Sequence, residues 1–219
     1  QFFISRSCTN SETIIDFSFF VRYPKSNLIR FHVSFPNFMT GKIFGFLRRE
    51  KMDQTNYELD LPRENIHLRC FAHHIMNYRY HWHTDEYELS IVLQGNQQYC
   101  RGTDTHTLLE DDLILTAPGN GHASTRQQPD TRALVLHFPA NALKFLNKKG
   151  YIYQFPSCLS NEGNRYEPRF CQLRFYAAQI WNAVEQGGAY AQLSAKANLE
   201  LLLIILFTRF DPQQLNLIS

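Results

Sequence analysis

The stretch HWHTDEYELSIVLQG, from His81 to Gly95, is the part of the sequence that decides the fold. Side chains in a β-strand alternate between its two faces, so His81 and His83 point to the same side. Residues 84–86 (Thr-Asp-Glu) can turn the chain, and Glu88 can then face both histidines from the next strand. We therefore expect two imidazoles and a carboxylate to converge inside a β-barrel.

A fourth histidine follows in the stretch DDLILTAPGNGH, where His122 comes after a glycine-proline turn that could bring it into the same cavity. Imidazole nitrogens and carboxylate oxygens are ligands for divalent metals, so one hypothesis is a metal site. The alternative is that each histidine, taken alone, is an ordinary hydrogen-bonded interior or surface residue. The residues of the candidate metal set are His81, His83, Glu88 and His122.

The bulk composition is that of a globular protein with one domain and an appendage. The chain has 219 residues, 44% of them hydrophobic and 19% charged, and its net charge is only +2. This charge is too small to indicate a surface that coats nucleic acid. The five cysteines include no C-x-x-C pair, which predicts free thiols in a reducing compartment and a cytoplasmic location. The longest apolar run, residues 201–207, is too short to predict a membrane span.

Residues 1–51 differ in composition from the rest of the chain. They hold ten of the eighteen phenylalanines, and their eight Lys/Arg outnumber three Asp/Glu. Their apolar residues keep neither the helical nor the strand period for long. One hypothesis is that this segment is translated upstream DNA and that the protein starts at Met52. The alternative is a genuine N-terminal extension with a pair of edge strands.

From residue 52 to residue 140, short apolar runs separated by Gly, Asn, Asp and Pro predict a small barrel or sandwich. Residues 141–168 would connect this barrel to two helices within residues 169–210. The second helix is apolar nearly all round, so it needs cover on two sides. A homodimer would supply the second cover, and the alternative is burial in the core of one chain. The residues expected at the dimer contact are Leu199, Leu202, Leu203 and Leu206.

These patterns resemble the cupin family. The first stretch fits the cupin signature H-x-H-x4-E-x6-G, and residues 117–122 (APGNGH) fit P-x-G-x2-H with alanine in the proline place. Two flanking positions depart from the pattern, because Ile75 replaces a glycine and Arg126 replaces an asparagine. The resemblance implies a mainly β, cupin-like barrel of the double-stranded β-helix or jelly-roll type, followed by the two-helix dimerisation hairpin.

The sequence of both stretches, together with the leucine-rich second helix, is similar to the sensor half of AraC-type transcription regulators over about residues 60–210. That resemblance implies a barrel that binds a small effector, with carbohydrate as the expected class, and a helical hairpin that dimerises. It also implies that DNA is bound only through a helix-turn-helix half outside this sequence, with residues 211–219 beginning the linker. Residues 53–65 would be an arm that either folds over the effector or forms a mobile tail.

We therefore expect a non-catalytic, cytoplasmic regulator domain that requires no cofactor, although a divalent metal would fit the site. The alternative is a stand-alone metal-dependent cupin enzyme, an isomerase or a dioxygenase. The residues expected to line the pocket are His81, His83, Glu88, His122 and Tyr99.

Overall fold

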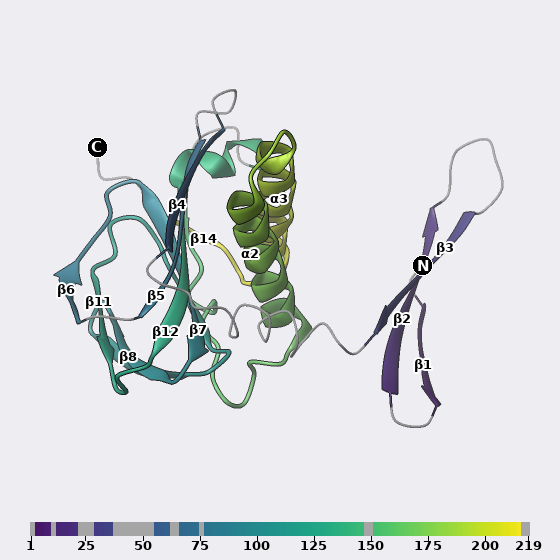
Figure 1. Cartoon of the computed structure of the whole chain (residues 1–219), viewed down its shortest axis with the longest axis horizontal. Coiled ribbons are helices and arrows are strands. Elements are labelled where there is room, and N and C mark those ends of the chain that lie inside the picture. The colour runs from purple at the N-terminus through teal and green to yellow at the C-terminus, as the bar shows by residue number, and fades with distance from the viewer. Residues whose placement is uncertain are drawn as a thin grey trace. The chain divides into compact units, whose positions relative to one another are not determined.

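The computed structural model describes residues 3–9, 12–21, 29–36, 55–61, 66–74, 77–146 and 151–215. The chain forms two compact units, Gln1–Phe46 and Leu47–Ser219, each of which is described here by itself. The first unit is an antiparallel meander in the order β1-β2-β3 (Figure 1), with bounds Phe3–Thr9, Glu12–Val21 and Ile29–Pro36. The apolar spacing did not predict these three strands, and the hypothesis of a start at Met52 stays a prediction.

The second unit is built on two antiparallel sheets. The five-stranded sheet has the order β10-β7-β12-β5-β4, with bounds Leu113–Thr116, Glu86–Gln94, Arg132–Pro139, Ile66–His74 and Thr55–Leu61. The four-stranded sheet has the order β6-β11-β8-β9, with bounds Tyr78–His81, His122–Arg126, Asn96–Arg101 and Asp104–Leu109. This mainly β arrangement confirms the cupin-like fold expected from the sequence.

The strand β7 shows why the sequence folds in this way. All of its residues from Tyr87 to Leu93 are buried, as expected for a central strand covered on both faces. Gly95 ends the strand with a φ of 74°, and a Cβ there would lie 2.8 Å from Thr131 Oγ1. A glycine is therefore required at this turn.

Two strands were missing from the sequence prediction. β11 begins at His122, where only a turn was expected. β4 occupies part of the predicted arm and pairs in register with β5, from Thr55 opposite Ala72 to Leu61 opposite Ile66. In the described part of the arm, the chain is therefore an edge strand of the sheet, which corrects the alternative of a mobile tail, whereas folding of the arm over an effector stays a prediction.

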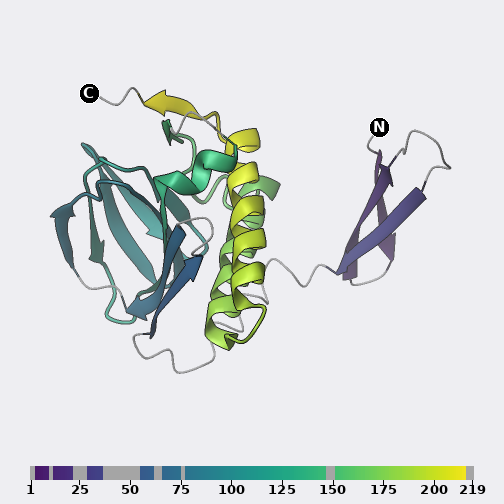
Figure 2. The same cartoon turned by 90° about the horizontal axis from the view of Figure 1, so that it is seen from above.

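The connecting segment and the helices follow the barrel. The short 3-10 helix η2 (Ala140–Phe145) and β13 (Ile152–Gln154) precede two antiparallel helices, α2 (Pro168–Gln186) and α3 (Ala191–Arg209). Pro168 opens α2, and Gly187 ends it with a φ of 62°. β14 (Gln213–Leu215) then pairs with β13, and Figure 2 shows this strand following the end of α3.

The choice of dimer residues requires a correction. The four leucines named for the dimer contact are each at most 1% exposed, because they face the core of their own chain: Leu199, Leu202, Leu203 and Leu206. The apolar side chains that α3 presents to solvent are instead Leu193, Leu201 and Ile204. By length and composition alone α3 could cross a membrane, but its buried leucines make it a cover for the barrel of this chain.

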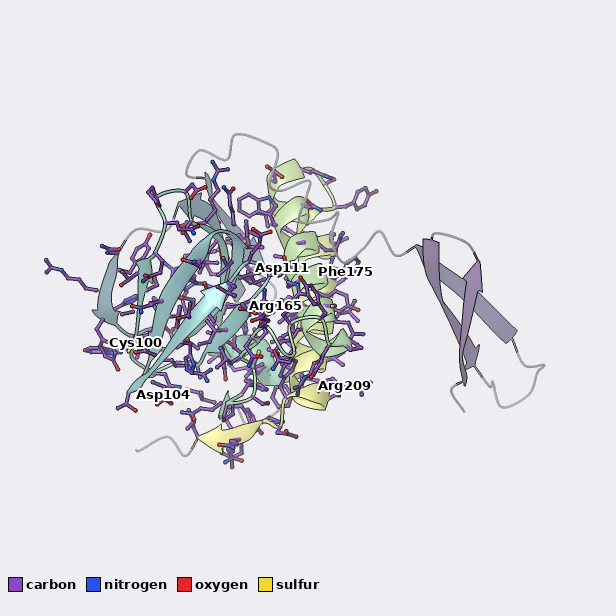
Figure 3. All side chains as sticks on the ribbon, turned by 90° about the horizontal axis from the view of Figure 1, so that it is seen from below. Cys100, Asp104, Asp111, Arg165, Phe175 and Arg209 are labelled. Atoms are coloured by element: carbon purple, nitrogen blue, oxygen red, sulfur yellow. The ribbon has the colours of Figure 1, made fainter. Side chains whose placement is uncertain are left out.

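A buried ion pair ties the barrel to the segment that leads into α2. Arg165 Nη2 lies 3.1 Å from Asp112 Oδ2, and Arg165 Nη1 donates to the carbonyl of Glu110 at 3.0 Å. Asp112 also accepts hydrogen bonds from Leu109 N at 2.9 Å and from Ser160 Oγ at 3.2 Å. Figure 3 shows Arg165 and the neighbouring Asp111 at the boundary between the strands and the helices. The barrel and the helices of this unit are therefore joined by specific polar contacts.

Candidate functional site

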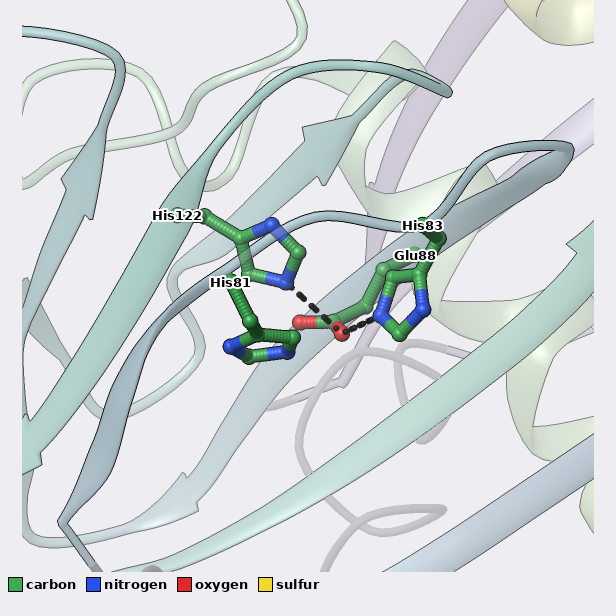
Figure 4. A group of neighbouring side chains, drawn as sticks. All are labelled: His81, His83, Glu88 and His122. Carbon is green, nitrogen blue, oxygen red and sulfur yellow. Dashed lines mark hydrogen bonds and ion pairs between the residues drawn. The ribbon is translucent and has the colours of Figure 1, made fainter.

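The four candidate residues come together between the two sheets (Figure 4). His81 ends β6, His83 lies in the short connection that follows, Glu88 lies on β7 and His122 begins β11. Backbone pairing places His122 directly opposite His81, with 4.3 Å between the two ring centroids. Glu88 and His122 are buried whereas His81 and His83 are half-buried, so the cluster is accessible from the side of these two histidines.

Glu88 is the centre of the cluster. Its Oε2 lies 3.1 Å from His122 Nε2 and 3.4 Å from His83 Nε2. Burial by itself would raise the pKa of Glu88, but the hydrogen bonds from His122 and His83 outweigh burial and hold this pKa well below its ordinary value. Glu88 is therefore a buried carboxylate whose charge is balanced by imidazoles.

His122 is the closest imidazole to Glu88. Its Nδ1 lies 3.2 Å from the carbonyl oxygen of Asn120, and its Nε2 lies 3.1 Å from Glu88 Oε2. Both partners are hydrogen-bond acceptors, an arrangement that favours the protonated ring. Burial lowers the pKa of His122, but the hydrogen bond and the charge of Glu88 outweigh burial and raise it.

Tyr99, which the sequence analysis expected to line the pocket, contacts the cluster. Its hydroxyl donates to Glu88 Oε1 at 2.9 Å and lies 3.1 Å from Thr116 Oγ1. Its ring stacks on that of His122, with 5.8 Å between centroids and 5° between planes. Burial, followed by the charge of Glu88, raises the pKa of Tyr99 well above its ordinary value, so this hydroxyl keeps its proton. Tyr99 thus fixes one carboxylate oxygen while the histidines contact the other.

The sequence analysis missed His137, which belongs to the same site. His137 is 5% exposed, and its Nε2 lies 3.4 Å from Glu88 Oε2. Its Nδ1 lies 3.6 Å from Glu86 Oε2, and Glu86 in turn forms an ion pair with Arg69. His137 has no motif around it. The only signal is its position opposite Glu88 across β12 and β7, which requires the strand register.

The strand register reveals a polar row that crosses the five-stranded sheet. Thr116 pairs with Glu88, Glu88 with His137, His137 with Arg69, and Arg69 with Glu58. Residues opposite one another in neighbouring strands share a face of the sheet. The candidate site is therefore one end of a polar row that reaches the edge strand β4.

The other aromatic candidates lie elsewhere. Trp82, the residue between His81 and His83, is 65% exposed. Tyr80 is 55% exposed and covers Gly121, where a Cβ would lie 2.2 Å from the tyrosine hydroxyl. Tyr87 is fully buried, and its hydroxyl donates to the carbonyl of Tyr153 at 2.8 Å. Of Tyr80, Tyr87 and Tyr99, it is Tyr99 that contacts the cluster, through Glu88 and His122.

The donor set fits a divalent transition metal. One donor atom from each of His81, His83, Glu88 and His122 lies within 4.8 Å of the others. Metal–nitrogen bonds of about 2.1 Å would require a modest contraction of this set. His81 Nδ1 donates to the carbonyl of Arg79 at 2.8 Å, which in a neutral ring leaves Nε2 as a ligand atom. Three imidazoles and a carboxylate suit Zn²⁺, Fe²⁺ or Ni²⁺.

Comparison with known proteins identifies the family. Residues 65–203 match the model of the AraC-like ligand binding domain, which is more than half of the chain. The chain belongs to this family. No curated protein is similar in sequence to this AraC-like domain.

Three solved structures illustrate its structural neighbours. The Cnp3 cupin domain of Schizosaccharomyces pombe is 12% identical, with 61% of this chain and 93% of that chain covered and a TM-score of 0.36. A cupin-2 domain containing protein from Shewanella frigidimarina is 14% identical, with coverages of 43% and 89% and a TM-score of 0.33. KdgF from Halomonas sp. is 17% identical, with coverages of 34% and 69% and a TM-score of 0.31. We draw no functional conclusion for the AraC-like domain from these three.

Proposed function

We propose that this chain is the effector-binding part of an AraC-type transcription regulator and that its effector is a small polyhydroxylated molecule, with carbohydrate as the leading class. The observation that carries the proposal is the accessible polar cluster around Glu88, inside a domain of the AraC-like ligand binding family. Glu88 can accept hydrogen bonds from hydroxyl groups, and the half-buried His81 and His83 can donate or accept them.

The proposed role is binding without turnover. Effector binding would change the state of the chain only if the effector binds one arrangement more tightly than another. The readout would be a change in how two copies present their DNA-binding halves. The exposed apolar side chains of α3, Leu193, Leu201 and Ile204, are the proposed contact between the two copies.

A thermal-unfolding screen tests the proposal. The chain, stripped of metal with a chelator, is mixed with pentoses, hexoses, their uronic acids and, for comparison, apolar compounds of similar size. A ligand at 100 times its Kd stabilises the folded state by about 2.7 kcal/mol. This corresponds to roughly 2–4 °C of Tm for each kcal/mol in a domain of this size.

The Glu88→Gln variant must lose the shift, whereas Glu185→Gln, which changes an exposed glutamate on α2, must keep it. The proposal fails if no hydroxylated compound shifts the Tm of the wild-type chain. It also fails if Glu88→Gln responds as the wild type does.

The second candidate function is that of a metal-dependent cupin enzyme, which is supported by the convergence of four donor atoms within 4.8 Å. A bound metal would supply Lewis acidity there, with His81, His83, Glu88 and His122 as ligands. Turnover of a hydroxylated compound that requires added metal and is lost in His83→Ala would favour this function over the sensor.

A further inference from the structure

The loop that leads into His122 contacts two of the candidate site residues. Gly119 N donates to the carbonyl of His83 at 2.7 Å, and His122 Nδ1 donates to the carbonyl of Asn120 at 3.2 Å. Gly119 has a φ of 77°, a backbone conformation that favours glycine. Residues 119–120 are therefore hydrogen-bonded to both His83 and His122.

The same loop is attached to β13. Gln154 Nε2 donates to Asn120 Oδ1 at 3.2 Å, and Gln154 is the last residue of β13. A second attachment comes from Tyr87, the neighbour of Glu88 on β7. The Tyr87 hydroxyl donates to the carbonyl of Tyr153 at 2.8 Å and accepts a hydrogen bond from Tyr153 N at 3.0 Å. Thus β13 is held at two adjacent residues, by Asn120 in the loop before His122 and by Tyr87 of β7.

β13 holds the segment that follows α3. Its pairing partner is β14, with Ile152 opposite Leu215, Tyr153 opposite Gln214 and Gln154 opposite Gln213. These two strands of three residues form a sheet by themselves among the strands that the structure describes. An isolated two-stranded sheet is marginally stable, so its population depends on what is attached to it.

We propose that the β13–β14 ladder is the output of the candidate site: occupation of the Glu88 cluster fixes the loop at Asn120, and the Asn120–Gln154 hydrogen bond favours the paired ladder over an open one. This inference rests on the proposed sensor function. An occupant that binds more tightly when the loop is fixed shifts the ladder toward pairing, and by linkage a paired ladder raises the affinity of the site for that occupant. The segment Gln213–Leu215 would then be in one of two states, paired with β13 or open.

Hydrogen–deuterium exchange of the peptide that contains Gln213–Leu215, in the full chain, tests the link. Asn120→Ala and Gln154→Ala each remove the side-chain hydrogen bond and leave the backbone pairing possible. Each is expected to speed exchange about 2- to 12-fold, the factor that corresponds to the net contribution of one hydrogen bond. Because both variants cut the same bond, the double variant should be no faster than either single variant. The matched control is Gln94→Ala, which removes a hydrogen bond of 2.8 Å to Asp130 Oδ2 and should leave this peptide unchanged.

Zn²⁺, which binds imidazole nitrogens, serves as the probe of occupancy, and its stoichiometry is measured in parallel. Bound zinc should slow exchange of this peptide in the wild-type chain and have no effect in Gln154→Ala. Unchanged exchange in either single variant, additive acceleration in the double variant, or no response of the wild type to bound zinc overturns the inference. Slower exchange with zinc while the effector screen is negative would keep the ladder and reject the proposed effector class. A positive effector screen without any change in exchange of the Gln213–Leu215 peptide would support the proposed effector class and reject the ladder as the output of the site.

Discussion

Glu88→Gln is the most informative single change, because it preserves the shape of the side chain and removes the charge at the centre of the site. In the wild type, burial lowers the pKa of His122 and is outweighed by the hydrogen bond and the charge of Glu88. In the variant, two influences on the pKa of His122 remain: burial, which lowers this pKa, and the hydrogen bond to the Asn120 carbonyl, which raises it. Because burial is the largest of all the causes, we expect the pKa of His122 to fall below its ordinary value, so the sign of its shift reverses.

The structure also sets the magnitude of the stability change. Removing one partner of a buried ion pair costs about 3–5 kcal/mol, because the other charge stays buried. His122 is 1% exposed and lies 3.1 Å from Glu88, so the range for a buried pair applies. Because we expect the His122 imidazole to lose its proton in the variant, the cost should be at the lower end of this range, about 3 kcal/mol. With roughly 2–4 °C for each kcal/mol, the Tm should fall by about 6–12 °C at neutral pH.

The assay combines NMR titration of the histidine side chains with thermal unfolding, both in the presence of a chelator. The exposed Glu185→Gln variant is the control, and its Tm and histidine titrations should match those of the wild type. The reasoning is refuted if the pKa of His122 in Glu88→Gln equals or exceeds that of the wild type. A Tm loss of the size seen in the control would refute it equally.

Three further predictions follow from the same structure. The close approach of the His137 ring, together with Arg69, lowers the pKa of Glu86 from 4.5 to about 2. The Glu86 carboxylate therefore contributes stability that is fully present above pH 4.5 and is lost as the pH falls to 2. Unfolding of the metal-free chain, measured across this pH range, should show a loss of up to about 3 kcal/mol. Arg165→Met leaves Asp112 buried without its partner and should cost about 3 kcal/mol in urea unfolding, and a loss below 1 kcal/mol would contradict the structural role of this ion pair. Leu201→Glu places a charge on the exposed face of α3 and should shift a dimer to monomer in sedimentation with an unchanged Tm of the monomer; a dimer of wild-type affinity would exclude this face.

The fold was predictable to the extent that local sequence carries it. The strand that contains Glu88 and the two helices within residues 169–210 were predicted from local sequence patterns, and the structure confirms them as β7, α2 and α3. β11 leaves no such pattern, because His122 and the small polar residues after it form a strand only through pairing with β6 and β8. Because α3 is apolar on nearly all sides, its sequence did not reveal which leucines face inward; that depends on where the barrel lies.

The candidate site likewise has residues that local sequence predicts and one residue that it does not. His81, His83 and Glu88 were predicted to converge because two-residue alternation and one tight turn bring them together within eight residues of sequence. His137 is 49 positions beyond Glu88 and meets it through strand pairing. A one-residue shift in that register would place His137 on the opposite face, so no local pattern could have identified it.

The position of β6 has a consequence for how this site can change its preference. Glu88 and His122 lie on strands with a neighbour on each side, whereas β6 is a four-residue strand at the edge of its sheet and carries His81 at its end. An edge strand can move outward by losing one set of ladder bonds, and an interior strand cannot. Glu88 and His122 are therefore held in place by neighbouring strands, whereas His81 and the adjacent His83 can shift together with β6. Insertions or substitutions in residues 77–85 could fit the same carboxylate centre to molecules of different size without rebuilding the barrel.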